Sequence, residues 1–350
     1  MAWEVPISRA GTIVAMVWVV SLSPLEAAAG LTHASRDGTA SSVRLATAEP
    51  RLARAASASR PPRPDGYFRL RPEGSWSSLP GGRTCANRIR SSRWEPRPQN
   101  HDPNHTMPEA ADVAASFAAR PRSSGEGTYA KRWDDWLLPR VRGHFTGRTD
   151  EIIQWAACRW GLSDNMLRAI VFRESTWFQY ETFPSGRCVL QYGCGDMFST
   201  DTADSRTYCD GLDAVGGYDY QADFGAGNCP QTFSIAGVMS WEDPAWVAPN
   251  PPWDGNQNGA FPFNRDSTAF ALEYLASYLR GCYEGWVRWL HPEGGGIWGC
   301  VGSWYSGDWH SAGANGYIRR VKATIARRTW LDPGFPDITP GCDPTYGCPS

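Results

Sequence analysis

The sequence predicts a mostly α-helical domain with a disulfide-rich insertion, preceded by a disordered N-terminal region. Hydrophobic residues recur at helical spacing between capping residues in the second half of the chain, where few alternating stretches typical of strands occur. Nine of the ten cysteines lie in residues 126–350. The chain of 350 residues has a formal net charge of −2. This near-neutral balance does not indicate a nucleic-acid partner.

The first residues predict an export signal. Arg9 precedes an apolar run over residues 10–25, and a stretch of small residues follows. A charged start, an apolar middle and a small-residue end are typical of a secretory signal peptide, which we assign to residues 1–29. Because the run is short and contains Pro24, we expect no stable membrane span after signal cleavage. An uncleaved anchor and a downstream translation start are the alternatives.

The next segment, residues 30–128, lacks sustained periodicity and is rich in Arg, Pro and Ser. Within residues 31–125 there are 15 Arg against 8 acidic residues. Such a composition buries too little apolar area to offset the entropy of ordering the chain. We therefore expect a disordered tether or propeptide here, with a small cryptic domain as the alternative.

Residues 129–335 are predicted to form the folded domain, built on four helices that capping residues and helical periodicity define. Gly161 is expected to end the first helix. A short additional helix is expected near residues 297–305. The residues expected to cap or start the four helices are, in chain order, Thr149 or Asp150, Ser163, Asp266 and Ser311.

The cysteines predict disulfides. None shows C-x-x-C spacing and no histidines cluster near them, so we expect no metal site and no cofactor. An export signal favours oxidised cysteines instead. The density of Cys and Gly in residues 188–229 predicts a long, helix-poor insertion whose connectivity stays open. Cys342 and Cys348 can close a loop in the tail, residues 336–350, whereas Cys85 is left over and expected to stay unpaired.

The most informative segment is the second helix. Leu167, Ile170, Val171 and Glu174 recur at helical spacing, which places a carboxyl group on the apolar face at the helix end. Burial and the negative end of the helix dipole are both expected to raise the pKa of this carboxyl. A carboxylic acid still protonated near neutral pH can serve as a general acid. The alternative is a Glu paired with an arginine in the core.

The helix, Gly turn and second helix ending in Glu-Ser over Ala156–Ser175 carry a family resemblance. Residues 148–332 resemble the lytic transglycosylase and goose-type lysozyme superfamily. The resemblance implies a lysozyme-like fold, with Glu174 as the catalytic acid and Ser175 behind it as a substrate-binding residue. The family's middle motif is a turn beside the cleft, and the run from Ile235 to Trp241 looks like it.

In that middle motif Ser240 stands where the family usually has Gln, beside Met239 and Trp241. A competing match is Ser185-Gly186 with Leu190-Gln191, but we favour the later segment. The family's third motif is similar to the stretch from Ser303 to Gly307 followed by the helix that carries Tyr317. The resemblance implies that the following residues line the sugar sites or approach the acid: Met239, Ser240, Trp241, Trp304, Tyr305, Ser306 and Tyr317.

The implied substrate is the β-1,4-linked glycan of peptidoglycan, cut at its MurNAc–GlcNAc linkages. The expected protein is a secreted, cell-wall-associated monomer whose only partner is the glycan strand, and the expected enzyme is a lytic transglycosylase. A hydrolytic lysozyme-like or chitinase-like enzyme is an alternative, because a second carboxylate from Asp196, Glu242 or Asp243 would favour hydrolysis. The second alternative is a catalytically weak or dead homologue that only binds glycan.

Residues 254–259 (Asp-Gly-Asn-Gln-Asn-Gly) match the first half of an EF-hand calcium loop. Arg265 occupies the position that usually supplies a bidentate Glu. The single negative charge of the loop is therefore too low to bind calcium tightly unless Asp266 also coordinates it. We therefore expect an ordinary Asn/Gly turn.

Overall fold

The structure is a computed structural model, and all the residues that it describes belong to one compact unit. The signal peptide assigned to residues 1–29 lies outside these residues, as does nearly all of the tail assigned to residues 336–350. The described ranges are 60–119, 129–179, 197–199, 202–239, 258–288, 290 and 296–338.

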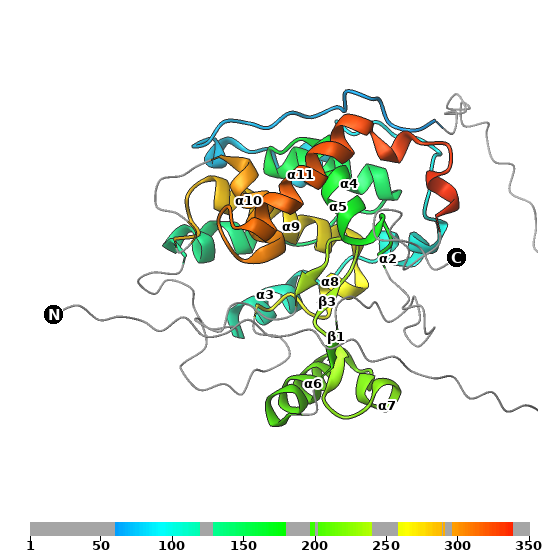
Figure 1. Ribbon diagram of the computed structural model, residues 1–350. Helices are drawn as coiled ribbons and strands as arrows, with labels where there is room; N and C mark the ends of the chain where they lie inside the picture. Colours follow the sequence, from blue (N-terminus) through cyan, green and yellow to red (C-terminus); the bar gives the residue numbers. More distant parts are fainter. Residues whose placement is uncertain are drawn as a thin grey trace, which may run out of the picture. The chain divides into compact units, whose positions relative to one another are not determined.

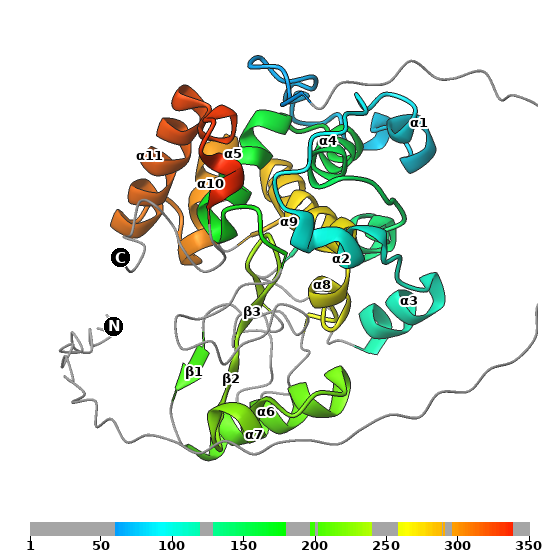
Figure 2. The same cartoon turned by 90° about the vertical axis from the view of Figure 1, so that its right-hand side faces the viewer.

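Helices dominate the described residues (Figure 1). Helix α5 packs against both α4 and α11, and α9 packs against α4 and α10 (Figures 1 and 2). The helices that form this core are α4 (Thr149–Trp160), α5 (Asp164–Ser175), α9 (Thr268–Tyr283), α10 (Ile297–Ser306) and α11 (Ala312–Arg327).

The predicted helix ends hold with two corrections, the first being that Thr149, expected with Asp150 as a cap of α4, is its first helical residue, while Arg148 is the N-cap. The Ser163 hydroxyl accepts the Met166 N–H at the start of α5, and Ser311 caps α11 in the same way. Gly161 ends α4 in the left-handed conformation, with φ of 61°, which a glycine adopts without steric strain. Asp266 was expected to start α9, but it ends the short helix α8 (Phe263–Asp266), and Ser267 is the cap.

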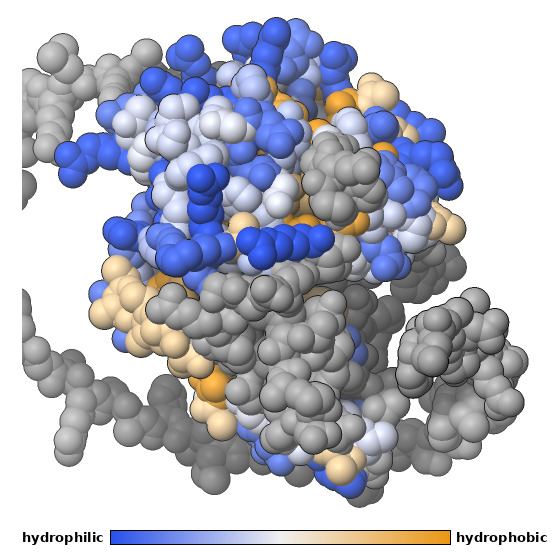
Figure 3. Space-filling view, turned by 90° about the vertical axis from the view of Figure 1, so that its left-hand side faces the viewer, coloured by the Kyte–Doolittle hydropathy of each residue, from blue (hydrophilic) through white to orange (hydrophobic). Residues whose placement is uncertain are grey.

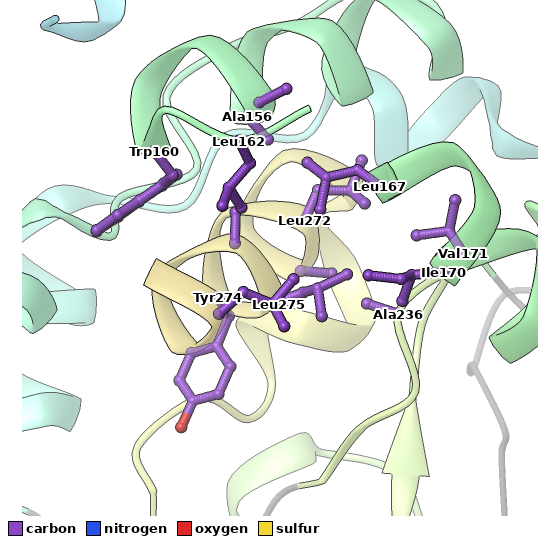
Figure 4. Packing of buried hydrophobic residues seen from close by; sticks show 14 of the residues in the cluster. Ala156, Trp160, Leu162, Leu167, Ile170, Val171, Ala236, Leu272, Tyr274 and Leu275 are labelled. Carbon is purple, nitrogen blue, oxygen red and sulfur yellow. The ribbon is translucent and has the colours of Figure 1, made fainter. Parts of the chain in front are cut away.

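The core lies between α4, α5 and α9. Leu167, Ile170 and Val171 of α5 are fully buried, as are Leu272 and Leu275 of α9. Figure 4 shows these side chains gathered around α9, with Leu167 pointing toward Leu272. Each fully buried aliphatic side chain contributes about 1.5–3 kcal/mol relative to exposure. This packing fixes the orientation of α5, and with it the position of Glu174 in its last turn.

The expected disordered tether is wrong for residues 60–119, which fold onto the helical core. Cys85, expected to be unpaired, forms a disulfide with Cys158 of α4. The backbone N–H groups of Tyr67 and Phe68 donate to the Asp164 carboxylate at the start of α5. The free energy that offsets the entropy of ordering this segment therefore comes from a disulfide and from buried polar contacts. Amino-acid composition reveals neither of them. Residues 30–59 and 120–128 of the expected tether lie outside the described residues.

This N-terminal segment contributes short helices rather than one long element. Its α-helices are α1 (Gly82–Ala86), α2 (His101–His105) and α3 (Ala110–Ala119). Single 3-10 or π turns accompany the helices, and they are η1 (Trp76–Ser78), η2 (Pro98–Asn100), η3 (Trp133–Leu137), η4 (Leu138–Arg140), η7 (Thr329–Leu331) and η8 (Phe335–Asp337).

The expected helix-poor insertion is also partly wrong, because it contains helices α6 (Ala203–Gly216) and α7 (Tyr220–Phe224). A small apolar cluster around the Cys209–Cys229 disulfide holds these helices to a two-stranded antiparallel sheet. Cys188 and Cys194 lie outside the described residues. The strands are β1 (Met197–Ser199) with β2 (Asn228–Pro230), and β3 (Thr232–Phe233) with β4 (Val238–Met239).

A third disulfide joins Cys282 and Cys300, so each of the six described cysteines is paired. Within the described ranges, no helix is both long enough and apolar enough to cross a membrane. Figure 3 shows one face, where hydrophilic residues predominate among those drawn in colour and hydrophobic residues form small groups. Apolar side chains are thus concentrated in the interior.

Candidate active site

Glu174 lies in the last turn of α5 and is half-buried. Ile170 and Val171, one turn earlier on the same face, are fully buried, and their side chains lie near Ala236 (Figure 4). The helical spacing read from the sequence therefore does bring this carboxyl group to the edge of the apolar core. It faces the turn between β3 and β4, residues 234–237.

The Tyr317 hydroxyl donates a hydrogen bond to Glu174 Oε1. Tyr317 comes from α11, as the family resemblance implied, and its side chain is 2% exposed. Burial raises the pKa of Tyr317 well above 10, and the charge of Glu174 and this hydrogen bond act in the same direction. The phenol therefore keeps its proton at physiological pH. It can donate a hydrogen bond to the carboxylate without transferring that proton.

Because of this hydrogen bond, the surroundings of Glu174 are not purely apolar. Desolvation disfavours an ionised carboxylate, whereas a donated hydrogen bond stabilises it. The two influences oppose each other at one group. Such a balance suits a carboxyl that must release a proton in one step and take one up in the next.

The opposite side of Glu174 is a tight backbone turn. Gly237 has φ of 61°, and a Cβ atom at this position would lie 2.8 Å from Glu174 Oε2. The backbone conformation favours glycine here, and a side chain at this position would have to push the Glu174 carboxylate aside. The turn is held on two sides, because Ile235 O accepts the Ser175 hydroxyl at 2.8 Å and Ala236 O accepts the Trp304 indole N–H at 3.2 Å.

An exposed aromatic ring lies next to this pair. The Tyr305 ring stacks on the Tyr317 ring with 4.7 Å between centroids and 5° between planes. Tyr305 is 52% exposed, so its outer face remains open to solvent. The Arg320 guanidinium lies 5.3 Å from the Tyr305 ring centroid and 5.7 Å from that of Tyr317. An open aromatic face beside a carboxyl is the arrangement on which an apolar face of a sugar ring can rest.

Some of the expected ligand-contacting residues have other roles. Ser175 is 3% exposed and its hydroxyl is bonded to backbone oxygen, which removes it from the residues that can contact a ligand directly. The Ser306 hydroxyl donates to Gly302 O and accepts the Asp308 N–H, so it organises the end of α10. Met239 is 40% exposed on β4, next to the turn.

Other expected positions lie outside the described residues: Ser240, Trp241, the candidate second carboxylates Asp196, Glu242 and Asp243, and the competing segment 185–191. The calcium-loop match is described only at its end. There the Asn258 amide donates to Met239 O, and its oxygen accepts the Ala260 N–H. Arg265 pairs with Asp266, the carboxylate that would have had to assist. Among the described side chains, no group of three or more His, Cys, Asp or Glu could hold a metal ion.

Sequence reasoning missed three buried polar residues next to this site. Arg97, Asn100 and Gln179 are each at most 1% exposed, and they contact the backbone that follows Glu174. Two of them lie in the Arg/Pro-rich stretch that composition assigned to disorder. A local signal was Trp94, a large aromatic residue among polar residues and prolines.

No family model matches this chain, and no curated protein or solved structure matches it at a significant level.

Proposed function

We propose that this protein cleaves the β-1,4-linked glycan of peptidoglycan, with Glu174 as general acid and base in a lysozyme-like helical domain. The observation that carries the proposal is the contact between Glu174 and Tyr317, next to the open face of Tyr305. A half-buried carboxyl held by a phenol, with an aromatic platform beside it, fits the cleavage of a glycosidic bond. Three disulfides are compatible with an exported protein.

The first chemical step is protonation of the leaving group. The protonated Glu174 carboxyl transfers its proton to the glycosidic oxygen, and the bond from that oxygen to the anomeric carbon breaks. Positive charge develops on the sugar ring as an oxocarbenium-like state. The Glu174 carboxylate that results is stabilised by the Tyr317 hydroxyl, so this bond strengthens as the proton leaves.

The second step consumes the oxocarbenium-like state. In a lytic transglycosylase the sugar's own 6-hydroxyl attacks the anomeric carbon, and its proton passes to the Glu174 carboxylate. The product is a 1,6-anhydro ring, and the enzyme returns to its protonated form without a water molecule. If a water attacks in place of the 6-hydroxyl, the product has a reducing end and the reaction is hydrolysis. We favour the transglycosylase outcome.

The decisive experiment compares the wild-type protein with Glu174→Gln on purified peptidoglycan sacculi and on chitin. Gln keeps the size of the side chain and its hydrogen bonding with Tyr317, but it cannot exchange the proton. We expect loss of glycan cleavage with an unchanged circular dichroism spectrum. Glu109→Gln is the matched control, because Glu109 is exposed at the start of α3 and should leave activity intact.

Mass spectrometry of the released fragments then separates the alternatives. Anhydro-muropeptides support the transglycosylase, and reducing ends alone identify a hydrolase. Cleavage of chitin but not of sacculi points to a chitinase-like enzyme. Glycan binding without cleavage by the wild-type protein would identify a binding protein and refute the catalytic role of Glu174.

A further inference from the structure

The backbone directly after the candidate acid is strained. Thr176 and Trp177 have φ of 50° and 73°, so two consecutive residues with side chains adopt the left-handed region. Residues with side chains are sterically strained in this region, and they persist there only where surrounding contacts hold them in place. The strained pair begins two residues after Glu174, so the contacts that hold it also set the end of α5.

The first of these contacts comes from a buried arginine far away in the sequence. Arg97 has no exposed surface, and its Nε donates to Thr176 O at 2.8 Å. Its Nη1 donates to Phe335 O at 2.8 Å, and the guanidinium lies 4.1 Å from the Phe335 ring centroid and 4.5 Å from that of Phe178. Burial lowers the pKa of Arg97 to about 10, which still leaves the group charged at neutral pH. A buried cation thus binds the carbonyl that ends α5.

The second contact is a pair of amides. Asn100 Nδ2 donates to Trp177 O at 2.7 Å, and Asn100 Oδ1 accepts the Gln179 N–H at 2.9 Å. Asn100 is 1% exposed and lies immediately before α2, which runs beside the chain that follows α5 (Figures 1 and 2). Buried amide hydrogen bonds of this kind are expensive to leave unmade, because the lost partner leaves an unpaired polar group.

Gln179 continues the connection to the other side of the site. Its Oε1 accepts the Ile235 N–H at 3.3 Å, in the turn that presents Gly237 to Glu174. Its Nε2 donates to Asn264 O and Arg265 O, both at 2.9 Å. Contacts from Asn100 therefore reach both the helix that carries the acid and, through Gln179, the turn opposite it.

We infer that residues 94–100, the N-terminal arm, are part of the catalytic unit, and that Arg97 and Asn100 are positioning residues for Glu174. The inference rests on the proposed function for its effect on reaction rate. The arm holds the strained turn, the turn sets the end of α5, and the end of α5 places the Glu174 carboxyl between Tyr317 and Gly237. The N-terminal segment is then required for catalysis and not only as a tether.

The chain offers a closely matched pair of variants to test this inference. Asn100 and Asn104 are both at most 2% exposed, and the Nδ2 of each donates to Thr149 Oγ1, at 3.1 and 3.0 Å. Only Asn100 also contacts Trp177 and Gln179. Asn100→Ala and Asn104→Ala should therefore lose similar stability, while only Asn100→Ala should displace Glu174.

Two measurements on the full chain follow. On soluble peptidoglycan fragments, Asn100→Ala should lower kcat by about 10- to 100-fold with KM changed less than about threefold, because a shift near 1 Å in a reacting group has an effect of this size. Asn104→Ala should stay within about threefold of wild type in kcat. The second measurement is the ¹³C resonance of the Tyr317 ring carbon that bears the hydroxyl, assigned with Tyr317→Phe. Asn100→Ala should shift this resonance and Asn104→Ala should not.

The outcomes separate this inference from the proposed function. The inference is overturned if Asn100→Ala leaves either the Tyr317 resonance or the kcat of an active enzyme unchanged, or if Asn104→Ala changes both as much. If the wild-type protein cleaves no glycan, or if Glu174→Gln is fully active, the proposed function fails. The Tyr317 resonance, which needs no substrate, then decides whether the arm holds the Glu174–Tyr317 contact. Arg97→Lys is a second variant, because it keeps the charge but loses the planar donors that bind the Thr176 and Phe335 carbonyls at once.

Discussion

The Tyr317 hydroxyl and the Glu174 carboxylate form a hydrogen bond across a separation of 143 residues. The bond joins α11 to α5, two helices that pack against each other along the core. A carboxyl group on one helix is thereby held by a hydrogen-bond donor on another. The proposed site therefore depends on the packing of these helices as much as on the identity of the two residues.

Tyr317→Phe removes only the donor. A hydrogen bond to a charged group contributes about 1.5–3 kcal/mol, so we expect kcat to fall about 10- to 100-fold. Without the donor the ionised carboxylate is less stable, so the limb of the pH–activity profile that requires the protonated acid should extend to higher pH. The control is Tyr208→Phe. It removes a buried hydroxyl that donates to Pro230 O, in the apolar cluster around the Cys209–Cys229 disulfide. An unchanged pH–activity profile in Tyr317→Phe would show that Tyr317 does not influence the catalytic acid.

The same tyrosine makes stability depend on alkaline pH. Burial raises the pKa of Tyr317 in the folded state well above 10, whereas a tyrosine in an unfolded chain titrates near pH 10. Its contribution is therefore fully present below about pH 10 and is lost as the pH rises from there toward the folded pKa. Above about pH 10, wild type should lose up to about 1.4 kcal/mol more per pH unit than Tyr317→Phe. Urea unfolding at a series of pH values measures the difference, and parallel curves would contradict it.

Tyr305 should act on substrate binding. Its ring is 52% exposed and stacks on Tyr317, so removing it takes away a platform without opening the core. We expect Tyr305→Ala to raise KM about tenfold, the equivalent of about 1.4 kcal/mol, with a smaller change in kcat. Tyr305→Phe keeps the ring and serves as the control, with KM close to wild type. An equal loss in both variants would show that the hydroxyl matters and the ring face does not.

The disulfides should differ in their contribution to stability. Cys85–Cys158 joins residues 73 apart, whereas Cys209–Cys229 joins residues 20 apart. Because a cross-link restricts the unfolded chain more when it closes a longer loop, replacing the first pair by Ala should cost about 1 kcal/mol more than replacing the second. Thermal or urea unfolding of the two double variants, compared with wild type, tests this. A larger loss for the Cys209–Cys229 pair would show that local packing outweighs loop length.

Local patterns were sufficient for the helices around the site. Ser163, Gly161 and Ser311 mark helix ends through interactions within one turn of chain, so their effects are visible in sequence. Helical spacing also placed Glu174 on the apolar face of α5, because the period of a helix is independent of what packs against it. The prediction that α9 starts at Asp266 was wrong because it also relied on local sequence alone. It precedes a helix, but the neighbouring Ser267 accepts the capping N–H and Asp266 pairs with Arg265.

By itself the sequence determined which residues share a helical face, where α5 and α11 begin and α4 ends, and that a carboxyl group stands at the end of α5. The tertiary structure alone decided that Tyr317 donates to that carboxyl, that Cys85 pairs with Cys158, and that Arg97 and Asn100 hold the turn after it. These last contacts join residues far apart in the chain. Their free energy comes from burial and pairing in the folded state, which composition and periodicity do not encode.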